Sequence, residues 1–354
     1  MVPYNLSLED ARRIPKILLH EHLDCSVRPA RLLELQSRRS RKSGVWLSGF
    51  VDSWDAARSS RSKDAAARRY GTWLRQYAKG SLPNYLDAIV RHVLPAMQDQ
   101  DSLYQITKDR IEDAIEDGVV AMQLRLAPQL HLREGLSTQE VLEPIMMAIR
   151  EYPIPVRLTL CSLRHENGRT ARHLADAVLR NDLITGFDLA GDETAFPGVP
   201  KWWLKQARRI KEGSDRKSIT CHLGETVPIT DQDHIDLDSV GCTELGHGFR
   251  GDCRDKTATI CVSSNIQTGQ FAVFRQHPVN AMLAAGKKIT IDTDGTLFTG
   301  TTASQEYQLL AKNFGWGLAE FEYVYGNALE KFRVNFHEHF DLSRLRSSIS
   351  KAHD

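Results

Sequence analysis

The chain has 354 residues, which is enough to bury a sizeable core in one large α/β domain or in two smaller ones. Its formal net charge of +1 argues against a protein that binds nucleic acid through a global positive field. The chain does not begin with a basic segment and a long apolar run, and it contains no apolar stretch of about 18 residues, so we expect no signal peptide and no membrane span.

Short β-type runs recur along the chain, and most are almost continuously apolar, as strands buried on both faces should be. They comprise residues 16–22, 119–126, 155–163, 184–191, 218–225, 243–248, 258–265 and 287–295. Several intervening segments have a helical pattern, namely residues 106–118, 138–152 and 168–180. In the second of these, Val141, Ile145 and Ile149 recur every four residues, which predicts one buried helix face.

Strands that alternate with helices predict a parallel sheet, and eight such strands predict a closed (β/α)₈ TIM barrel. We expect residues 1–354 to form this barrel as one domain, with a doubly wound open sheet as the alternative. Extra helices are expected in the insertion at residues 37–98, with solvated basic faces favoured over a lid on the barrel mouth. Only residues 249–257 separate the sixth and seventh runs, which predicts a shortened crossover.

Nearly the same pentapeptide occurs twice, as HEHLD at residues 20–24 and as HEHFD at residues 337–341. At the end of a strand, His20 and His22 would point to the same face and could hold one ion together. The second copy follows a stripe of phenylalanines with helical spacing. On a helix, His337 and His339 would face different directions, so only the first copy is a candidate metal site.

Further polar residues follow other predicted strands. His222 and Glu225 end the fifth run, His247 ends the sixth, and Asp292 and Asp294 end the eighth. In a barrel of parallel strands these ends meet at one rim, where barrel enzymes place their chemistry. Three histidines and a carboxylate suit zinc, with room for a water molecule.

Together these motifs make the chain resemble the adenosine deaminase family of metal-dependent amidohydrolases. The resemblance runs from about residue 15 to residue 330, and the motifs occur in the family's order. The motifs are HEHLD (20–24), LRLAPQLH (124–131), FDLAGDE (187–193), CHLGE (221–225), ELGHG (244–248), CVSSNIQTG (261–269), DTDG (292–295) and GTTASQEY (300–307).

The resemblance implies one Zn²⁺ per chain, held by four residues: His20, His22, His222 and Asp294. It further implies three catalytic roles. Glu225 is the general acid and base, His247 supports the developing oxyanion charge, and Asp294 accepts a hydrogen bond from the attacking water.

The resemblance also implies the substrate contacts and the reaction. Asp24 would contact a ribose hydroxyl, and the backbone N–H of Gly191 would meet the purine ring. The implied reaction is zinc-dependent hydrolytic deamination of adenosine or a related aminopurine nucleoside. Water is the second substrate, and ammonia and an inosine-type nucleoside are the products. Nucleic-acid editing deaminases instead carry HxE followed by PCxxC, and this chain has no PCxxC.

The chain departs from the family pattern at two positions of the implied substrate site. Gly295 stands where a second aspartate binds the five-membered ring of the purine, and Cys25 stands where glycine is usual. A missing hydrogen bond to a charged group typically costs about 1.5–3 kcal/mol. Gly295 therefore keeps an alternative open, in which the substrate is a modified adenine nucleoside or another amino-heterocycle. A catalytically silent binding barrel is disfavoured because every implied ligand and Glu225 are present.

The remaining cysteines and histidines have structural interpretations. None of the six cysteines forms a CxxC pair, so buried free thiols in a reducing cytoplasm are expected. We expect six further histidines to be solvated: His92, His131, His173, His234, His277 and His353.

Overall fold

The computed structural model describes residues 5–43 and 62–336. In this part of the chain, eight parallel strands lie side by side in sequence order. A parallel bridge between Glu21 and Asp294 joins the last strand to the first. The predicted closed barrel is therefore confirmed, and the open sheet is wrong. The strands are β1 (Lys16–His22), β2 (Val119–Leu126), β3 (Val156–Leu163), β4 (Ile184–Ala190), β5 (Ser218–Leu223), β6 (Glu244–His247), β7 (Thr257–Ile260) and β8 (Ile289–Ile291).

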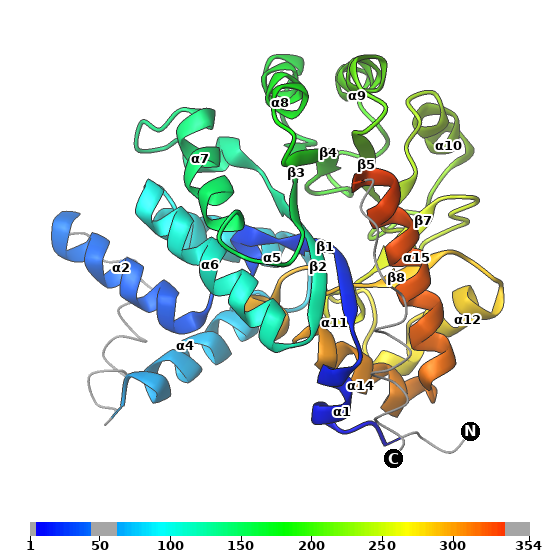
Figure 1. Ribbon diagram of the computed structural model, residues 1–354, viewed down its shortest axis with the longest axis horizontal. Helices are drawn as coiled ribbons and strands as arrows, with labels where there is room; N and C mark the ends of the chain where they lie inside the picture. The colour runs from blue at the N-terminus through cyan, green and yellow to red at the C-terminus, as the bar shows by residue number, and fades with distance from the viewer. Residues whose placement is uncertain (1–4, 44–61, 337–354) are drawn as a thin grey trace.

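Helices surround the strands, and α2 and α4 project to one side of the barrel (Figure 1). The α-helices are α1 (Leu8–Arg13), α2 (Pro29–Ser43), α4 (Lys63–Tyr77), α5 (Leu82–Ala88), α6 (Gln100–Glu116), α7 (Thr138–Ile149), α8 (Gly168–Arg180), α9 (Lys201–Gly213), α10 (Asp231–Asp238), α11 (Val262–Gln267), α12 (Val279–Ala284), α13 (Thr296–Thr299), α14 (Ala303–Phe314) and α15 (Leu318–Phe336). The short 3₁₀ and π turns are η1 (Leu23–Cys25), η2 (Ile89–Val93), η3 (Leu94–Ala96), η4 (Pro128–His131) and η5 (Phe274–Gln276).

Helix α7 illustrates how the sequence determines a helix and its orientation. Ser137 and Glu140 form a capping box at its start, which satisfies backbone N–H groups that have no partner within the helix. Val141, Ile145 and Ile149, the predicted stripe, are all buried against the core. Burial of each such side chain stabilises the fold by about 1.5–3 kcal/mol relative to leaving it exposed.

The inserted segment between β1 and β2 has two kinds of surface. Arg68 and Arg69 on α4 are exposed, as predicted for solvated basic helices. In contrast, α5 and η2 place Leu82, Tyr85 and Ile89 in the wall of the main pocket at the barrel mouth. The prediction of solvated helices is therefore incomplete, because part of the insertion covers the mouth as the lid alternative required.

The region around β6 and β7 differs in part from expectation. No helix lies between His247 and Thr257, which confirms the shortened crossover. The predicted strand over residues 258–265 is wrong beyond Ile260, because α11 begins at Val262. Strand β7 pairs with β6 and β8 only over residues 257–260, so the backbone beyond has no neighbouring strand and turns into a helix.

Two other predictions concern the C-terminal copy of the pentapeptide and membrane association. His337 and His339 lie outside the described residues. Among residues 5–43 and 62–336, no helix combines the length and the apolar character that crossing a bilayer requires. The six cysteines are all buried free thiols, as predicted.

Candidate metal centre and active site

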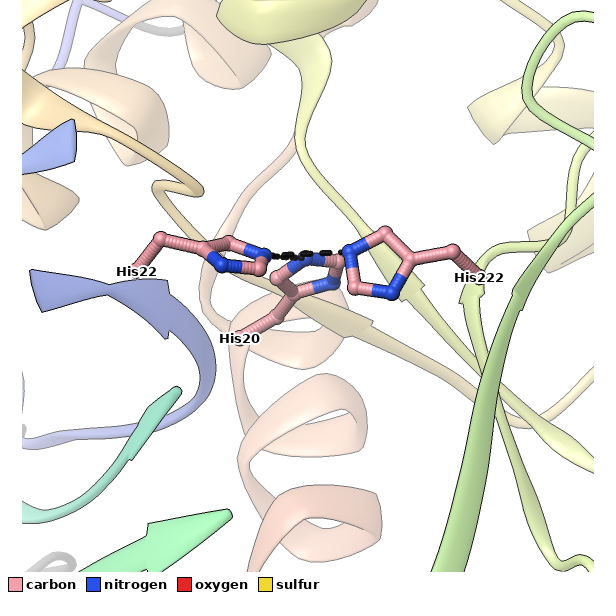
Figure 2. Close-up of side chains that lie close together, drawn as sticks. All are labelled: His20, His22 and His222. Carbon is pink, nitrogen blue, oxygen red and sulfur yellow. Dashed lines mark hydrogen bonds between the residues drawn. The ribbon is translucent and has the colours of Figure 1, made fainter. Parts of the chain in front are cut away.

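Three imidazole rings converge at the carboxyl end of the barrel. Strand β1 contributes His20 and His22, and β5 contributes His222, so that their Nε2 atoms face one another (Figure 2). The Nε2 atom of His22 lies 3.2 Å from that of His20 and 3.0 Å from that of His222. The alternation of side chains along β1 places the first two on one face, as the HxH spacing predicts.

Neighbouring residues determine which ring nitrogen carries the proton in two of these histidines. The Thr259 hydroxyl donates to the Leu245 carbonyl, so it accepts from Nδ1–H of His20 at 2.8 Å. Nδ1 of His222 lies 2.7 Å from the Asp188 carboxylate, which favours a proton there. Both Nε2 atoms therefore present lone pairs to the common point, the orientation that metal-binding histidines adopt.

Asp294 supplies a fourth ligand atom. Its Oδ1 lies 3.6 Å from Nε2 of His20 and 3.6 Å from Nε2 of His22, while Ser264 donates to Oδ2 at 2.5 Å. Atoms at the corners of a tetrahedron, each 2.0–2.1 Å from a central ion, lie about 3.3 Å apart. The observed separations of 3.0–3.6 Å agree with this geometry, so the four residues fit a tetrahedral divalent ion.

His247 lies beside this cluster but presents a proton rather than a lone pair. The backbone N–H of Val279 donates to Nδ1 of His277, so Nε2–H of His277 donates to the Asn265 carbonyl oxygen. The Asn265 amide must then donate to Nδ1 of His247, at 3.1 Å. Nε2 of His247 carries the proton and lies 3.5 Å from the Glu225 carboxyl. His247 is therefore arranged as a hydrogen-bond donor and not as a ligand.

This chain of hydrogen bonds predicts the effect of Asn265→Asp. Aspartate keeps the shape of asparagine but can only accept, so it would move the proton of His247 from Nε2 to Nδ1. Losing a donor aimed at developing negative charge typically costs about 10²–10³-fold in kcat. We expect a kcat loss of this size with one metal ion still bound per chain, measured by ammonia release and metal analysis.

The control for this variant is Asn313→Asp on α14, where the side-chain amide donates to the Leu309 carbonyl outside the pocket. This control should keep the wild-type kcat. If Asn265→Asp keeps wild-type kcat, or if its only change is loss of metal, the assigned direction of the hydrogen bonds is wrong.

Glu225 follows β5 on a loop that another carboxylate holds in place. The Glu193 carboxylate accepts from four successive backbone N–H groups, at residues 224 to 227, at 2.7–3.1 Å. Burial, together with the charges of Asp294 and Glu193, raises the pKa of Glu225 well above its usual value. Glu225 is therefore a buried carboxylic acid that keeps its proton at neutral pH and can donate it.

The barrel interior below the cluster is polar, although TIM barrels usually fill this layer with branched apolar side chains. The fully buried Arg125 contacts Asp188 at 3.2 Å and Glu244 at 2.5 Å. Burial alone would raise the pKa of Asp188, but His222 and Arg125 lower it well below its usual value, so Asp188 stays ionised beneath His222. Asp292 accepts from the backbone N–H groups of Leu19 and His20 at 2.6 and 3.0 Å and so holds β1 in place.

The backbone is strained at two of the site residues. His247 has φ = 66° and Asp294 has φ = 59°, in the left-handed region that non-glycine residues rarely adopt. Such strain costs about 1–3 kcal/mol per residue and is commonly found at functional sites. The backbone of Asp294 is held there by hydrogen bonds to β1, because His22 N–H donates to Asp294 O at 2.7 Å and Asp294 N–H donates to His20 O at 3.0 Å.

A pocket opens onto the cluster, and the predicted substrate residues lie at it. Asp24 and Gly191 line it together with His22, His222, Glu225, His247 and Asp294. Burial raises the pKa of Asp24 to about 6. Gly191 has φ = 106°, a conformation that favours glycine, and this leaves the backbone open to a ligand. Gly295 adjoins the pocket beside Tyr85 and Cys25.

The sequence interpretation missed several residues that shape this site. An aspartate within an apolar strand was an available signal for Asp188. Thr259 and Asn265 carried no such signal, because their roles depend on neighbours from other strands. The prediction of solvated histidines is wrong for His92, His131, His234 and His277, which are buried. His173 is exposed, as predicted, and His353 lies outside the described residues.

The chain is similar to proteins of known activity along most of its length. A sequence model of the adenosine deaminase family matches residues 64–351. Adenosine deaminase 1 of Streptomyces coelicolor is 32% identical, over 92% of this chain and 84% of the relative. The adenosine deaminase of Mycobacterium marinum is 29% identical, over 95% of each chain.

Solved structures share the fold. The N6-methyl-AMP deaminase of Arabidopsis thaliana superposes with a TM-score of 0.76 at 24% identity and covers 98% of this chain and 99% of its own. The adenine deaminase of Arthrobacter aurescens superposes with a TM-score of 0.73 at 19% identity, covering 96% and 98% of the two chains. At these identities the likeness supports the barrel fold alone.

Proposed function

The chain belongs to the adenosine deaminase family, and from that premise we propose that its substrate is an uncharged purine nucleoside, with Zn²⁺ as metal and water as second substrate. As a family member it is a hydrolase that acts on a C–N bond of a cyclic amidine and deaminates adenosine or a related aminopurine. The observation that carries the finer proposal is one pocket in which a tetrahedral set of ligand atoms faces a protonated Glu225.

The donor set supports zinc as the metal. His20, His22 and His222 offer three imidazole nitrogens and Asp294 one carboxylate oxygen, a mixture that suits zinc better than the all-oxygen sites of magnesium or calcium. When bound, such an ion lowers the pKa of a water molecule from 15.7 to about 7 and so supplies hydroxide at neutral pH.

The protein side chains then account for the proton transfers. Glu225 is held protonated and can deliver its proton to the ring nitrogen next to the carbon under attack, so that negative charge does not build up on the ring. Nε2–H of His247 points into the same space and can donate to the attacking oxygen. Ionised again, Glu225 can accept a proton and return it to the departing ammonia.

The charge of the pocket favours a nucleoside over a nucleotide. Among the described residues that line it there is no lysine and no arginine, while Asp24, Asp192 and Glu225 are acidic. A phosphate dianion would meet carboxyl groups and no cation, and like charges placed together cost several kcal/mol. A ribose hydroxyl can instead donate to Asp24, the contact that the family resemblance implies.

The wall from the insertion keeps the second candidate substrate open. Leu82, Leu86 and Ile89 form an apolar side of the pocket, and Gly295 lacks the carboxylate of the family pattern. These features are compatible with an N6-alkylated adenine nucleoside. As for the location of the enzyme, six buried free thiols agree with the reducing cytoplasm that we propose.

The test of this function is ammonia release from a panel comprising adenosine, 2′-deoxyadenosine, N6-methyladenosine, adenine and AMP, with the zinc-loaded enzyme. For N6-methyladenosine, methylamine is measured as well. We expect kcat/KM for adenosine to exceed that for AMP by about 10²-fold or more, because several kcal/mol of repulsion correspond to at least that factor. A preference for AMP would refute the nucleoside proposal, and absence of any turnover with metal bound would refute the deaminase function itself.

A further inference from the structure

The two departures from the family pattern lie against each other and against a third residue. A Cβ atom placed on Gly295 would overlap the Tyr85 hydroxyl and would lie 2.5 Å from Cβ and 2.9 Å from the carbonyl oxygen of Cys25. The φ angle of Gly295 is −151°, which any residue can adopt. Glycine is therefore required here for space and not for backbone conformation, because Tyr85 and Cys25 occupy the volume where an aspartate side chain would begin.

Tyr85 comes from α5, the part of the insertion that covers the barrel mouth, and it lines the pocket together with Cys25 and Asp294. The residue is 3% exposed, and its hydroxyl has no hydrogen-bond partner of regular geometry among the described residues, although the Cys25 thiol lies beside it. Buried hydroxyl groups nearly always have a partner, so an unpaired one that adjoins a pocket indicates a contact with the ligand.

The chemistry of the hydroxyl suits an acceptor atom on that ligand. Burial, together with the nearby charge of Asp294, raises the pKa of Tyr85 well above its usual value, so the hydroxyl keeps its proton and can donate. The aromatic ring packs on Phe298 at a centroid distance of 4.8 Å, which fixes the direction of the side chain. A purine offers an unprotonated nitrogen in its five-membered ring, and such a nitrogen accepts one hydrogen bond.

We propose that the Tyr85 hydroxyl binds the five-membered ring of the purine substrate in place of the absent aspartate, and that Gly295 makes room for this hydroxyl. The inference rests on the proposed function, because it assumes a purine nucleoside in the pocket. It accounts for Gly295 by one exchange, in which a carboxyl group from the end of β8 is replaced by a hydroxyl from the inserted helix. Tyr85 is then a determinant of specificity that the core barrel does not contain.

The test compares Tyr85→Phe with the wild type on adenosine and on 7-deazaadenosine, in which C–H replaces the ring nitrogen. A hydrogen bond of ordinary strength corresponds to a factor of about ten. We expect Tyr85→Phe to lower kcat/KM for adenosine about tenfold or more, and to change kcat/KM for 7-deazaadenosine less than about threefold. Each ratio compares one substrate between two variants, so differences in intrinsic reactivity cancel.

Two controls separate this role from a structural one. Tyr152→Phe, which removes a hydroxyl that contacts Glu112 outside the pocket, should leave both kcat/KM values unchanged. The thermal midpoint of Tyr85→Phe should match that of the wild type, because only an unpaired hydroxyl is removed. Equal losses on both substrates would overturn the role of Tyr85 while the deaminase function stands. If the wild type turns over neither nucleoside, the proposed function fails first and this inference fails with it.

Discussion

The variant Glu225→Gln is expected to lower kcat for adenosine by about 10²–10⁴-fold, the range that general acid–base catalysis typically contributes. Glutamine has nearly the shape of a protonated glutamic acid, but its amide cannot deliver a proton to the purine ring or collect one from water. Glu225 lies in the pocket and outside the four ligand atoms, so the metal content should stay at that of the wild type. Single-turnover rates and metal analysis on the same preparation measure both quantities.

A matched control is Glu143→Gln on α7, an exposed glutamate whose carboxylate accepts only from Gln139 on the same helix. This variant should retain the wild-type rate. If Glu225→Gln retains more than about a tenth of the wild-type kcat, the acid–base role belongs to another residue. His247, whose Nε2 lies 3.5 Å from the Glu225 carboxyl, would be the next candidate.

The variant His222→Ala is expected to lose both the bound metal and the activity. It removes one of four ligand atoms and leaves Asp188, which is ionised and fully buried, without the imidazole that it faces at 2.7 Å. The loss of rate should be at least as large as that of Glu225→Gln, because the source of hydroxide is lost along with the ion. Asp188→Asn should give a graded effect, with metal affinity weakened by about 10–100-fold, as is typical when the partner of a ligating histidine is changed.

Metal content per chain after dialysis and the dissociation constant from chelator competition measure these effects. His173→Ala, which truncates an exposed histidine on α8, serves as the control and should bind metal as the wild type does. Circular dichroism establishes whether His222→Ala remains folded. A folded His222→Ala variant that keeps one metal ion per chain and normal activity would show that the metal lies elsewhere.

The eight strands and the position of the first metal-binding pair could be predicted because both depend on local patterns. Apolar runs of strand length, separated by helical periodicities, indicate a parallel barrel, and the alternation of β1 puts His20 and His22 on one face. The same reasoning fails at residues 262–265, where the apolar and β-branched pattern continues but the chain forms α11. The absence of partner strands beyond Ile260 ends β7, and a single sequence does not reveal which backbone groups lie alongside.

The sequence by itself determined which residues carry ionisable groups at strand ends, and with the family resemblance it determined the donor set and the reaction class. Only the tertiary structure decided how these groups are oriented. The chain from His277 through Asn265 to His247 and the contact of Asp188 with His222 join residues of different elements. Likewise, Tyr85 lies more than 200 positions from Gly295 in sequence, yet its hydroxyl occupies the space beside that glycine. The physical reason is that hydrogen-bond direction and excluded volume depend on distances of a few ångströms between elements, which folding brings together and which no local periodicity encodes.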